Sequence, residues 1–363
     1  MTHCKTLRPQ PEEGPAADQT PAASSRGSHR GICLGNNALR PARAGLAALL
    51  LGLALALMLV LVAVPGIASA QQLNGFDLSD ALIPAAAIER GGPPRDGIPA
   101  IDHPRFVPAS RAGLADDDRV LGLAHGGVVR AYPVAILNWH EVVNDRVAGL
   151  PVAVTYCPLC GTGVAFDARL GGAGRPAAVF AVSGLLFNSD VLLYDRGTES
   201  LWSQLMFQAV SGPLKGQRLR RLPISHTSWA DWRRRHPGSE VLSRDTGFER
   251  DYHRDPYAGY DQVARLMFEV QHRDDRLPAK AWVLGLQLGQ QARAYPFSVL
   301  AARVDAQGRL RETVAGQTVE IRYDRQHRSA EAFDAQGRPL AAVTAYWFAW
   351  FAFHPKTSVL TLP

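Results

Sequence analysis

The residues best suited to chemistry are two cysteines three positions apart, in Cys157-Pro158-Leu159-Cys160-Gly161. Cysteines at this spacing form a strained disulfide, a redox-active dithiol, or a pair of thiolate ligands to one metal ion. Proline after the first cysteine and glycine after the second favour a tight, knuckle-like turn. The stretch therefore predicts a chemical centre, although it does not name a reaction.

The residues after the pair favour a metal knuckle over a thioredoxin-type site. A thioredoxin-type pair opens a helix whose N-terminal dipole lowers the thiol pKa, whereas here Gly161-Thr162-Gly163 and a strand-like Val-Ala-Phe follow. C-P-x-C-G resembles the turns of rubredoxin and zinc ribbons, where two such turns usually supply four ligands. The sequence has one, so histidine or carboxylate side chains would complete the site. We expect a divalent metal, zinc first and copper or iron after it, and thiol-redox chemistry stays open.

The first candidate for a further ligand or catalytic partner is His140, in Trp139-His140-Glu141. This segment is predicted to form a helix that leads into the cysteine strand. Glu141 is a candidate for acid–base catalysis, together with Asp145 four residues later. His253 and His354 are the next histidines to consider. For each of these residues an ordinary core or surface role is the alternative.

An internal repeat organises the middle and end of the chain. The segment 120–133 and the segment 283–296 are identical at nine of fourteen positions, and both end in Arg-Ala-Tyr-Pro. Each copy predicts two strands joined by a glycine turn, a short helix entered near Tyr-Pro, and two further strands. We therefore expect a β-rich α+β fold of two related halves from an internal duplication, the first half enlarged by an insertion over 178–275.

The repeat aligns Cys157 with Asp324 and Cys160 with His327. One interpretation is that the second copy lost its cysteines and serves as scaffold. The other is that the two copies pack about a pseudo-twofold axis, so that Asp324 and His327 meet the thiolates. A Cys₂-His-Asp set suits zinc or another divalent metal.

The chain divides into four predicted segments, and the first carries an export signal. Residues 44–64 are uncharged and apolar, follow Arg40 and Arg43, and precede the small-x-small pattern Ala68-Ser69-Ala70. Residues 1–70 are thus a signal peptide or an N-terminal anchor, and 71–110 form a Pro/Gly-rich lead-in. The first repeat, with the cysteines and the insertion, covers 111–275, and the second, compact repeat covers 276–363. We expect a periplasmic or extracellular protein, attached to a membrane only if the first segment stays uncleaved.

The charge of the folded part excludes a nucleic-acid-binding surface of the usual kind. The chain has a formal net charge of +6, but beyond residue 70 there are 33 basic and 30 acidic side chains without a dense basic block. Such a balance predicts no nucleic-acid partner. The expected partners are an unidentified small molecule or a redox partner protein.

Several stretches resemble a known family. They include Gly91-Gly92-Pro93-Pro94-Arg95-Asp96-Gly97, Asn138-Trp139-His140-Glu141, Thr155-Tyr156-Cys157-Pro158-Leu159-Cys160-Gly161-Thr162 and Ser183-Gly184-Leu185-Leu186-Phe187-Asn188-Ser189-Asp190. Together they resemble an exported bacterial and archaeal family catalogued as a domain of unknown function, of the DUF3179 type, over about 88–358. The resemblance implies export and an important cysteine stretch, but it implies no activity.

The sequence predicts an exported protein with a metal-binding or thiol-redox centre at Cys157 and Cys160, and it does not decide whether the protein is an enzyme. In a redox protein, Cys157 would be the nucleophile and Cys160 the resolving thiol. The alternative is a non-catalytic extracytoplasmic module in which the pair is a structural disulfide or zinc clamp. A structural site should be closed and buried, whereas a functional one should be reachable from solvent.

Overall fold

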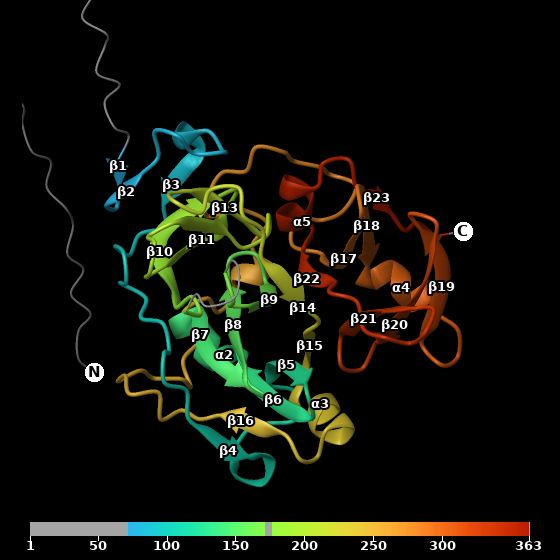
Figure 1. The fold of residues 1–363 in the computed structure, drawn as a ribbon. Coiled ribbons are helices and arrows are strands. Elements are labelled where there is room, and N and C mark those ends of the chain that lie inside the picture. Colours follow the sequence, from blue (N-terminus) through green and yellow to red (C-terminus); the bar gives the residue numbers. More distant parts are fainter. Residues whose placement is uncertain (1–71, 171–175, 363) are drawn as a thin grey trace, which may run out of the picture. The chain divides into compact units, whose positions relative to one another are not determined.

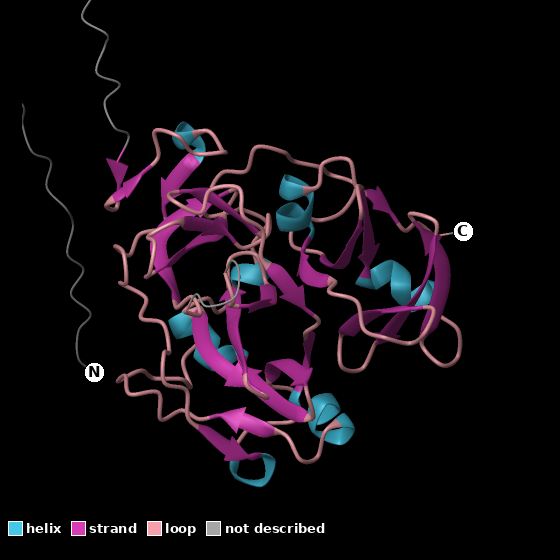
Figure 2. Ribbon diagram, viewed as in Figure 1, coloured by secondary structure: helices cyan, strands magenta, loops and turns pink. Residues whose placement is uncertain are grey.

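The computed structural model describes residues 72–170 and 176–362. In these residues, five sheets of three to five strands are arranged as the blades of a five-bladed β-propeller (Figures 1 and 2). A two-stranded ribbon, β1 (Gln72–Leu73) and β2 (Phe76–Asp77), precedes them. The predicted signal or anchor over 1–70 lies outside the described residues, and none of the described helices is long and apolar enough to span a membrane.

Two of the sheets share one strand order. The first is β15 (Ser225–Ser228), β5 (Arg119–His125), β6 (Val128–Pro133), β16 (Glu240–Leu242) and β4 (Phe106–Pro108). The second is β22 (Val343–Tyr346), β17 (Trp282–Leu288), β18 (Gln291–Pro296) and β23 (Ser358–Val359). In each sheet the central pair is an antiparallel hairpin and the strand after it is parallel.

The other three sheets complete the set. One contains β14 (Arg220–Leu222), β9 (Thr162–Asp167), β8 (Leu150–Cys157) and β7 (Val142–Val147). A second contains β19 (Arg309–Val314), β20 (Gln317–Asp324) and β21 (Ser329–Asp334). The third contains β13 (Gln208–Ser211), β12 (Leu201–Ser203), β11 (Asp190–Asp195), β10 (Phe180–Phe187) and β3 (Ile88–Arg90).

The predicted α+β class with two halves is wrong. The described residues contain four α-helices of seven residues each, α2 (Val134–His140), α3 (Trp229–Arg235), α4 (Phe297–Arg303) and α5 (Trp347–Phe353). Short 3₁₀ turns add Ala85–Ala87, Ala109–Arg111 and Tyr260–Gln262. The repeated sequence does predict the strands and the helix after Tyr-Pro, because these depend on local pattern. The arrangement of the sheets depends on long-range packing instead, and the sheets are arranged as propeller blades rather than as two halves.

The repeated Arg-x-Tyr pattern has a structural reason. Tyr132 donates to Asp145 at 2.6 Å, and the Arg130 guanidinium pairs with the same carboxylate. In the second copy, Arg293 pairs with Glu312 at 2.6 Å, and Tyr295 donates to the same carboxylate. In each copy, the Arg and Tyr of the hairpin thus bind a carboxylate on the strand that follows the short helix, β7 in the first copy and β19 in the second. Asp145, a candidate for acid–base catalysis, is thus engaged by both Tyr132 and Arg130.

A tryptophan closes each of the two matching sheets. Trp232 of α3 lies against Gly122 of β5, and Trp350 of α5 lies against Gly285 of β17. Both tryptophans are fully buried, and α5 is buried along almost all its length. The sheets therefore pack their helices across glycine, where a strand has no side chain to interfere.

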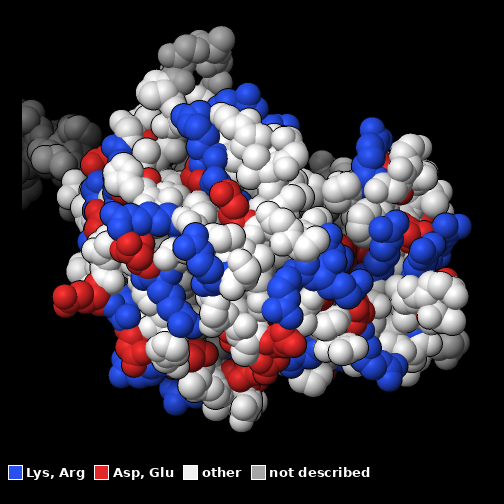
Figure 3. All heavy atoms as spheres, turned by 90° about the horizontal axis from the view of Figure 1, so that it is seen from below, with Lys and Arg blue, Asp and Glu red and all other residues white. Residues whose placement is uncertain are grey.

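The surface carries mixed charge. Figure 3 shows Lys and Arg side chains next to Asp and Glu side chains on one face. Many form ion pairs, such as Arg311 of β19 with Glu320 of the neighbouring β20, and Arg322 with Glu320 along β20 itself. Exposed pairs of this kind contribute about 0–1 kcal/mol each, so the buried aromatic and aliphatic core carries most of the stability.

Candidate functional site

The cysteine pair lies in the turn between β8 and β9. Cys157 ends β8, and the Cys160 N–H donates to the Cys157 carbonyl at 3.2 Å. Gly161 has a φ of +64°, a conformation that favours glycine. The predicted tight turn is confirmed, and a strand rather than a thioredoxin-type helix follows, because β9 begins at Thr162.

A carboxylate from the next hairpin completes a three-residue cluster. Asn188 and Ser189 form the turn between β10 and β11 with φ values of +52° and +64°, and Asp190 follows them. The Cys157 Sγ, the Cys160 Sγ and a carboxylate oxygen of Asp190 all lie within 4.8 Å of one another. The Cys160 thiol also lies 3.3 Å from the Ser189 carbonyl oxygen, to which it donates.

The cluster is buried and lacks a counter-charge. Cys157 is 2% exposed, and Cys160 and Asp190 are 0% exposed. The Asp190 Oδ2 accepts the Leu205 N–H at 3.1 Å, whereas Asp190 Oδ1 and the Ser189 hydroxyl have no partner. In the described part of the chain, no Lys, Arg or His forms an ion pair with Asp190. A buried oxygen without a partner costs free energy and marks a position for a ligand.

The electrostatics of the cluster follow from that burial. Burial raises the pKa of both thiols, and the neighbouring Asp190 charge adds to the effect. Burial also raises the pKa of Asp190 to about 7. Without a cation, the thiols and the carboxyl are therefore held toward their neutral forms, which disfavours an attacking thiolate.

Glu141 lies next to this cluster. It is the C-cap of α2, with a φ of +56°, and is 7% exposed. Burial, followed by the charge of Asp190, raises the pKa of Glu141 to about 8. Its own charge raises the pKa of Cys157 in turn. The structure thus brings together three of the predicted residues, Cys157, Cys160 and Glu141.

His140 lies outside the cluster. Its Nδ1 is 2.8 Å from the Pro99 carbonyl oxygen, and its Nε2 is 2.7 Å from the Tyr252 hydroxyl. Both ring nitrogens are therefore occupied by hydrogen bonds. The side chain braces the C-terminal end of α2 and fixes the start of the turn that presents Glu141.

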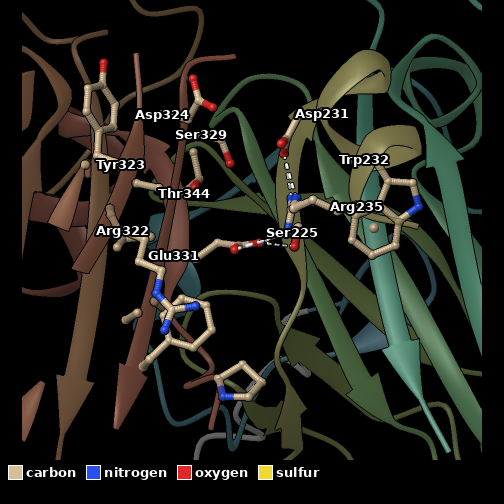
Figure 4. A pocket seen from close by; sticks show the side chains of 18 of the residues that line it. Ser225, Asp231, Trp232, Arg235, Arg322, Tyr323, Asp324, Ser329, Glu331 and Thr344 are labelled. Carbon is tan, nitrogen blue, oxygen red and sulfur yellow. Dashed lines mark hydrogen bonds and ion pairs between the residues drawn. The ribbon is translucent and has the colours of Figure 1, made fainter. Parts of the chain in front are cut away.

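Asp324 and His327 also lie apart from the cysteines. They form a separate cluster with Asp231, within 4.8 Å. Asp231 and Asp324 also line a cavity of about 800 Å³ (Figure 4). Asp231 already pairs with Arg234 and Arg235. The structure therefore does not place the second copy's Asp and His beside the thiolates, because the two copies occupy different blades.

His253 and His354 take other positions. His253 is exposed, and its Nε2 is 3.4 Å from Arg244. The His354 ring packs on Trp350 at a centroid distance of 3.9 Å, and its Nε2 is buried without a partner. Neither belongs to the cysteine cluster.

We expect His354 to make the protein less stable in mild acid. Burial, followed by the positive charge of Arg221, lowers the pKa of His354 to about 4. An unfolded histidine titrates near 6.5, so between about pH 6.5 and 4 the unfolded chain binds the extra proton. This stabilisation is complete above pH 6.5 and is lost as the pH falls toward 4, by up to about 3 kcal/mol. Urea unfolding at pH 7 and 5 should show a smaller loss for His354→Gln than for the surface control His253→Gln. Equal losses in both variants would contradict this assignment.

A second cavity of about 450 Å³ lies beside α2, the helix that Glu141 caps. Its lining includes Trp139, Asn138, Ile98 and Tyr257. Asp255 fixes this wall, because its Oδ1 accepts the Asn138 amide and the Tyr257 N–H, both at 2.9 Å. Burial, followed by the charges of Glu141 and Cys157, raises the pKa of Tyr257.

Sequence reasoning missed Asp190 as a site residue. The structure places it directly after a turn, as the first residue of β11. The available signal was its position at the end of Ser183–Asp190, one of the stretches that carry the family resemblance. A turn next to a buried strand can place a carboxylate in the core, which local pattern does not show.

Comparisons with known proteins give a family without an activity. The family described as "Protein of unknown function (DUF3179)" matches residues 95–357. No curated protein and no solved structure matches the chain.

Proposed function

Because this chain belongs to the DUF3179 family of proteins of unknown function, its function has to be argued from the site, and we propose a divalent-metal centre. The thiolates of Cys157 and Cys160 and the carboxylate of Asp190 are the ligands of this centre. Zinc is the metal that this set of donors suits best, since two sulfurs and an oxygen match its ligand preferences. The export of the protein, inferred from residues 44–70, is part of the proposal.

The unpaired Asp190 Oδ1 beside two buried sulfurs carries the proposal. The two thiols and the Asp190 carboxyl, which can each become anionic, are buried together, and the Glu141 carboxyl adds a fourth acidic group nearby. Such a group of acids is costly to ionise without a cation. A bound divalent cation would offset the charge and favour the deprotonated thiols.

The same environment argues against a thiol-redox centre. A redox cysteine needs a lowered thiol pKa and access for its partner. Both thiols here are buried, and burial raises their pKa values. The turn also leads into a strand, so no helix N-terminus assists Cys157.

Three protein ligands leave one position open on a tetrahedral metal, where a bound zinc ion would act as a Lewis acid. Glu141 is suited to hold or move a proton there, because its carboxyl is buried beside the cluster and lies outside the three-residue ligand set. The cavity lined by Trp139 and Tyr257 offers a space for a small molecule. These features support a catalytic or ligand-binding centre.

Complete burial of the cysteines favours one second candidate, a structural metal clamp. In a clamp, Glu141 would close the coordination as the fourth ligand. We expect Glu141→Gln to retain about one equivalent of metal, with affinity changed by less than about tenfold, since Glu141 stands outside the three-residue cluster. Chelator competition against the wild type measures this. Loss of the metal in Glu141→Gln would favour the clamp.

The test of the proposal is metal analysis of the full chain purified without chelator. We expect about one equivalent of zinc-class metal and thiols protected from alkylation until the metal is removed. A protein without metal, two hydrogens lighter than the dithiol and alkylated only after reduction, would contradict the metal centre. A metal-free protein with both thiols intact, which takes up no added zinc, would contradict it as well.

A further inference from the structure

Gln204 is a fully buried amide whose side chain bonds to the two strands that carry the cysteines. Its Oε1 accepts the Thr162 hydroxyl at 2.8 Å, and its Nε2 donates to the Thr155 hydroxyl oxygen at 2.9 Å. The Thr155 hydroxyl in turn donates to the Val164 carbonyl at 3.2 Å. Both threonines are fully buried as well. A buried polar network whose members all have partners fixes one arrangement of the segments that it joins.

The two threonines lie on either side of the cysteine turn. Thr155 lies on β8 two residues before Cys157, and Thr162 begins β9 two residues after Cys160. In the ladder between these strands, Thr162 pairs with Cys157. The amide of Gln204 therefore bridges both strands at the place where the turn begins and ends.

The backbone around Gln204 holds the carboxylate of the cluster. The Leu205 N–H donates to Asp190 Oδ2 at 3.1 Å, whereas Asp190 Oδ1 has no partner among the described residues. The Gln204 N–H donates to the carbonyl of Val191, the next residue after Asp190, at 3.5 Å. The turn 203–207 is closed by its own backbone hydrogen bond at 3.1 Å. The same short turn thus contacts the cysteine strands through one side chain and Asp190 through its backbone.

The cysteine turn and Asp190 belong to different sheets, so their donor atoms share one metal ion only if the distance between the sheets is fixed here. We infer that Gln204 is a positioning residue of the metal centre. Its amide holds the cysteine turn, and Leu205 turns Asp190 so that Oδ2 is engaged and Oδ1 is left for the metal. Gln204 itself is not a ligand in this role. The inference rests on the proposed function, because it requires that the cluster binds metal.

The test replaces the amide by an apolar side chain of similar length, Gln204→Met, in the full chain. We expect the affinity for zinc, measured by chelator competition, to fall about 10–100-fold, as when a group that orients a metal ligand is lost. Cobalt(II) bound in place of zinc reports the coordination geometry through its visible absorption, which should differ between variant and wild type. A merely structural role would lower the free energy of unfolding in urea and leave the cobalt spectrum of the folded protein unchanged.

Asn144→Leu is the matched control. The Asn144 amide joins the same two sheets, because it donates to the Phe180 carbonyl at 2.8 Å and accepts the Phe180 N–H at 2.9 Å. Phe180 lies at the end of β10 opposite to the turn that precedes Asp190. We expect Asn144→Leu to lose stability but to bind zinc as tightly as the wild type, with the same cobalt spectrum. An equal loss of zinc affinity in this control would overturn the inference, because the effect would then come from stability in general.

A milder variant, Thr162→Val, keeps the test usable if Gln204→Met does not fold. It removes the hydroxyl that Gln204 Oε1 accepts and should weaken zinc binding in the same direction. Wild-type affinity and cobalt spectrum in both variants would overturn the positioning role and leave the metal centre intact. A wild-type protein that binds neither zinc nor cobalt would contradict the metal centre itself, and the positioning role with it.

Discussion

The double substitution Cys157→Ser/Cys160→Ser is expected to reduce bound metal from about one equivalent to less than about a tenth. Serine hydroxyls stay protonated at neutral pH and are poor ligands for zinc. The fold should survive in part, because serine has nearly the volume of cysteine and the turn is also held by the Tyr346 N–H to Cys160 carbonyl bond. Elemental analysis and circular dichroism of the same sample measure both effects.

Asp190→Asn tests the third ligand more specifically, because it keeps the shape of the side chain and removes its charge. An asparagine oxygen is a weaker ligand than a carboxylate, so we expect metal affinity to fall by at least about a hundredfold, as when one direct metal ligand is lost. The Leu205 N–H still has an oxygen acceptor. Retention of wild-type affinity in Asp190→Asn would contradict the proposed ligand set.

Two controls separate the cysteine cluster from the other candidates. His140→Gln should keep the metal, since both His140 nitrogens are bonded to Pro99 and Tyr252. Asp324→Asn/His327→Gln should also keep it, because these residues lie with Asp231. If Asp324→Asn/His327→Gln lost the metal while the cysteine variant kept all of it, the metal centre would lie in the Asp231 cluster instead.

The sequence was most informative where chemistry and local pattern coincide. The spacing of Cys157 and Cys160, with Pro158 and Gly161, indicates a turn, and the structure has that turn with Gly161 at positive φ. The repeat predicts two further strands after the short helix, and the structure shows β7 (Val142–Val147) and β8 (Leu150–Cys157) there. Both depend on neighbours in the chain, so one sequence is enough to predict them.

The long-range parts of the site could not be predicted in this way. Asp190 meets the cysteines because β10–β11 packs beside the β8–β9 turn in one hydrophobic core. Asp324 and His327 align with the cysteines in sequence, yet the blade arrangement puts them beside Asp231. A repeat predicts similar local elements, whereas the contacts between its copies depend on how five sheets pack.

Substitution of the glycine that faces a buried tryptophan is expected to have the second large effect, a loss of folding stability. A Cβ on Gly285 would lie 2.2 Å from the Trp350 ring. That ring has little room to move, since its Nε1 donates to Thr357 Oγ1 at 3.0 Å and His354 packs on its face. We expect Gly285→Ala to lower the free energy of unfolding by about 3 kcal/mol, at the upper end of overpacking costs. Urea unfolding of the full chain measures it.

The comparison that isolates this clash is a double-mutant cycle. Gly289→Ala is the matched control, because Gly289 has a φ of +57° but nothing within 4 Å of its added Cβ, so it should cost about 1 kcal/mol from backbone strain alone. Trp350→Leu removes the ring that the alanine would strike. The double variant Gly285→Ala/Trp350→Leu should therefore be destabilised by clearly less than the sum of the single variants, with a coupling of about 1–3 kcal/mol. Additive losses would mean that the strand itself requires Gly285, whatever lies against it. The same cycle can be made at Gly122, where an added Cβ would lie 2.3 Å from the Trp232 ring. If the losses at Gly285 and Trp350 were additive, the losses at Gly122 and Trp232 should be additive too.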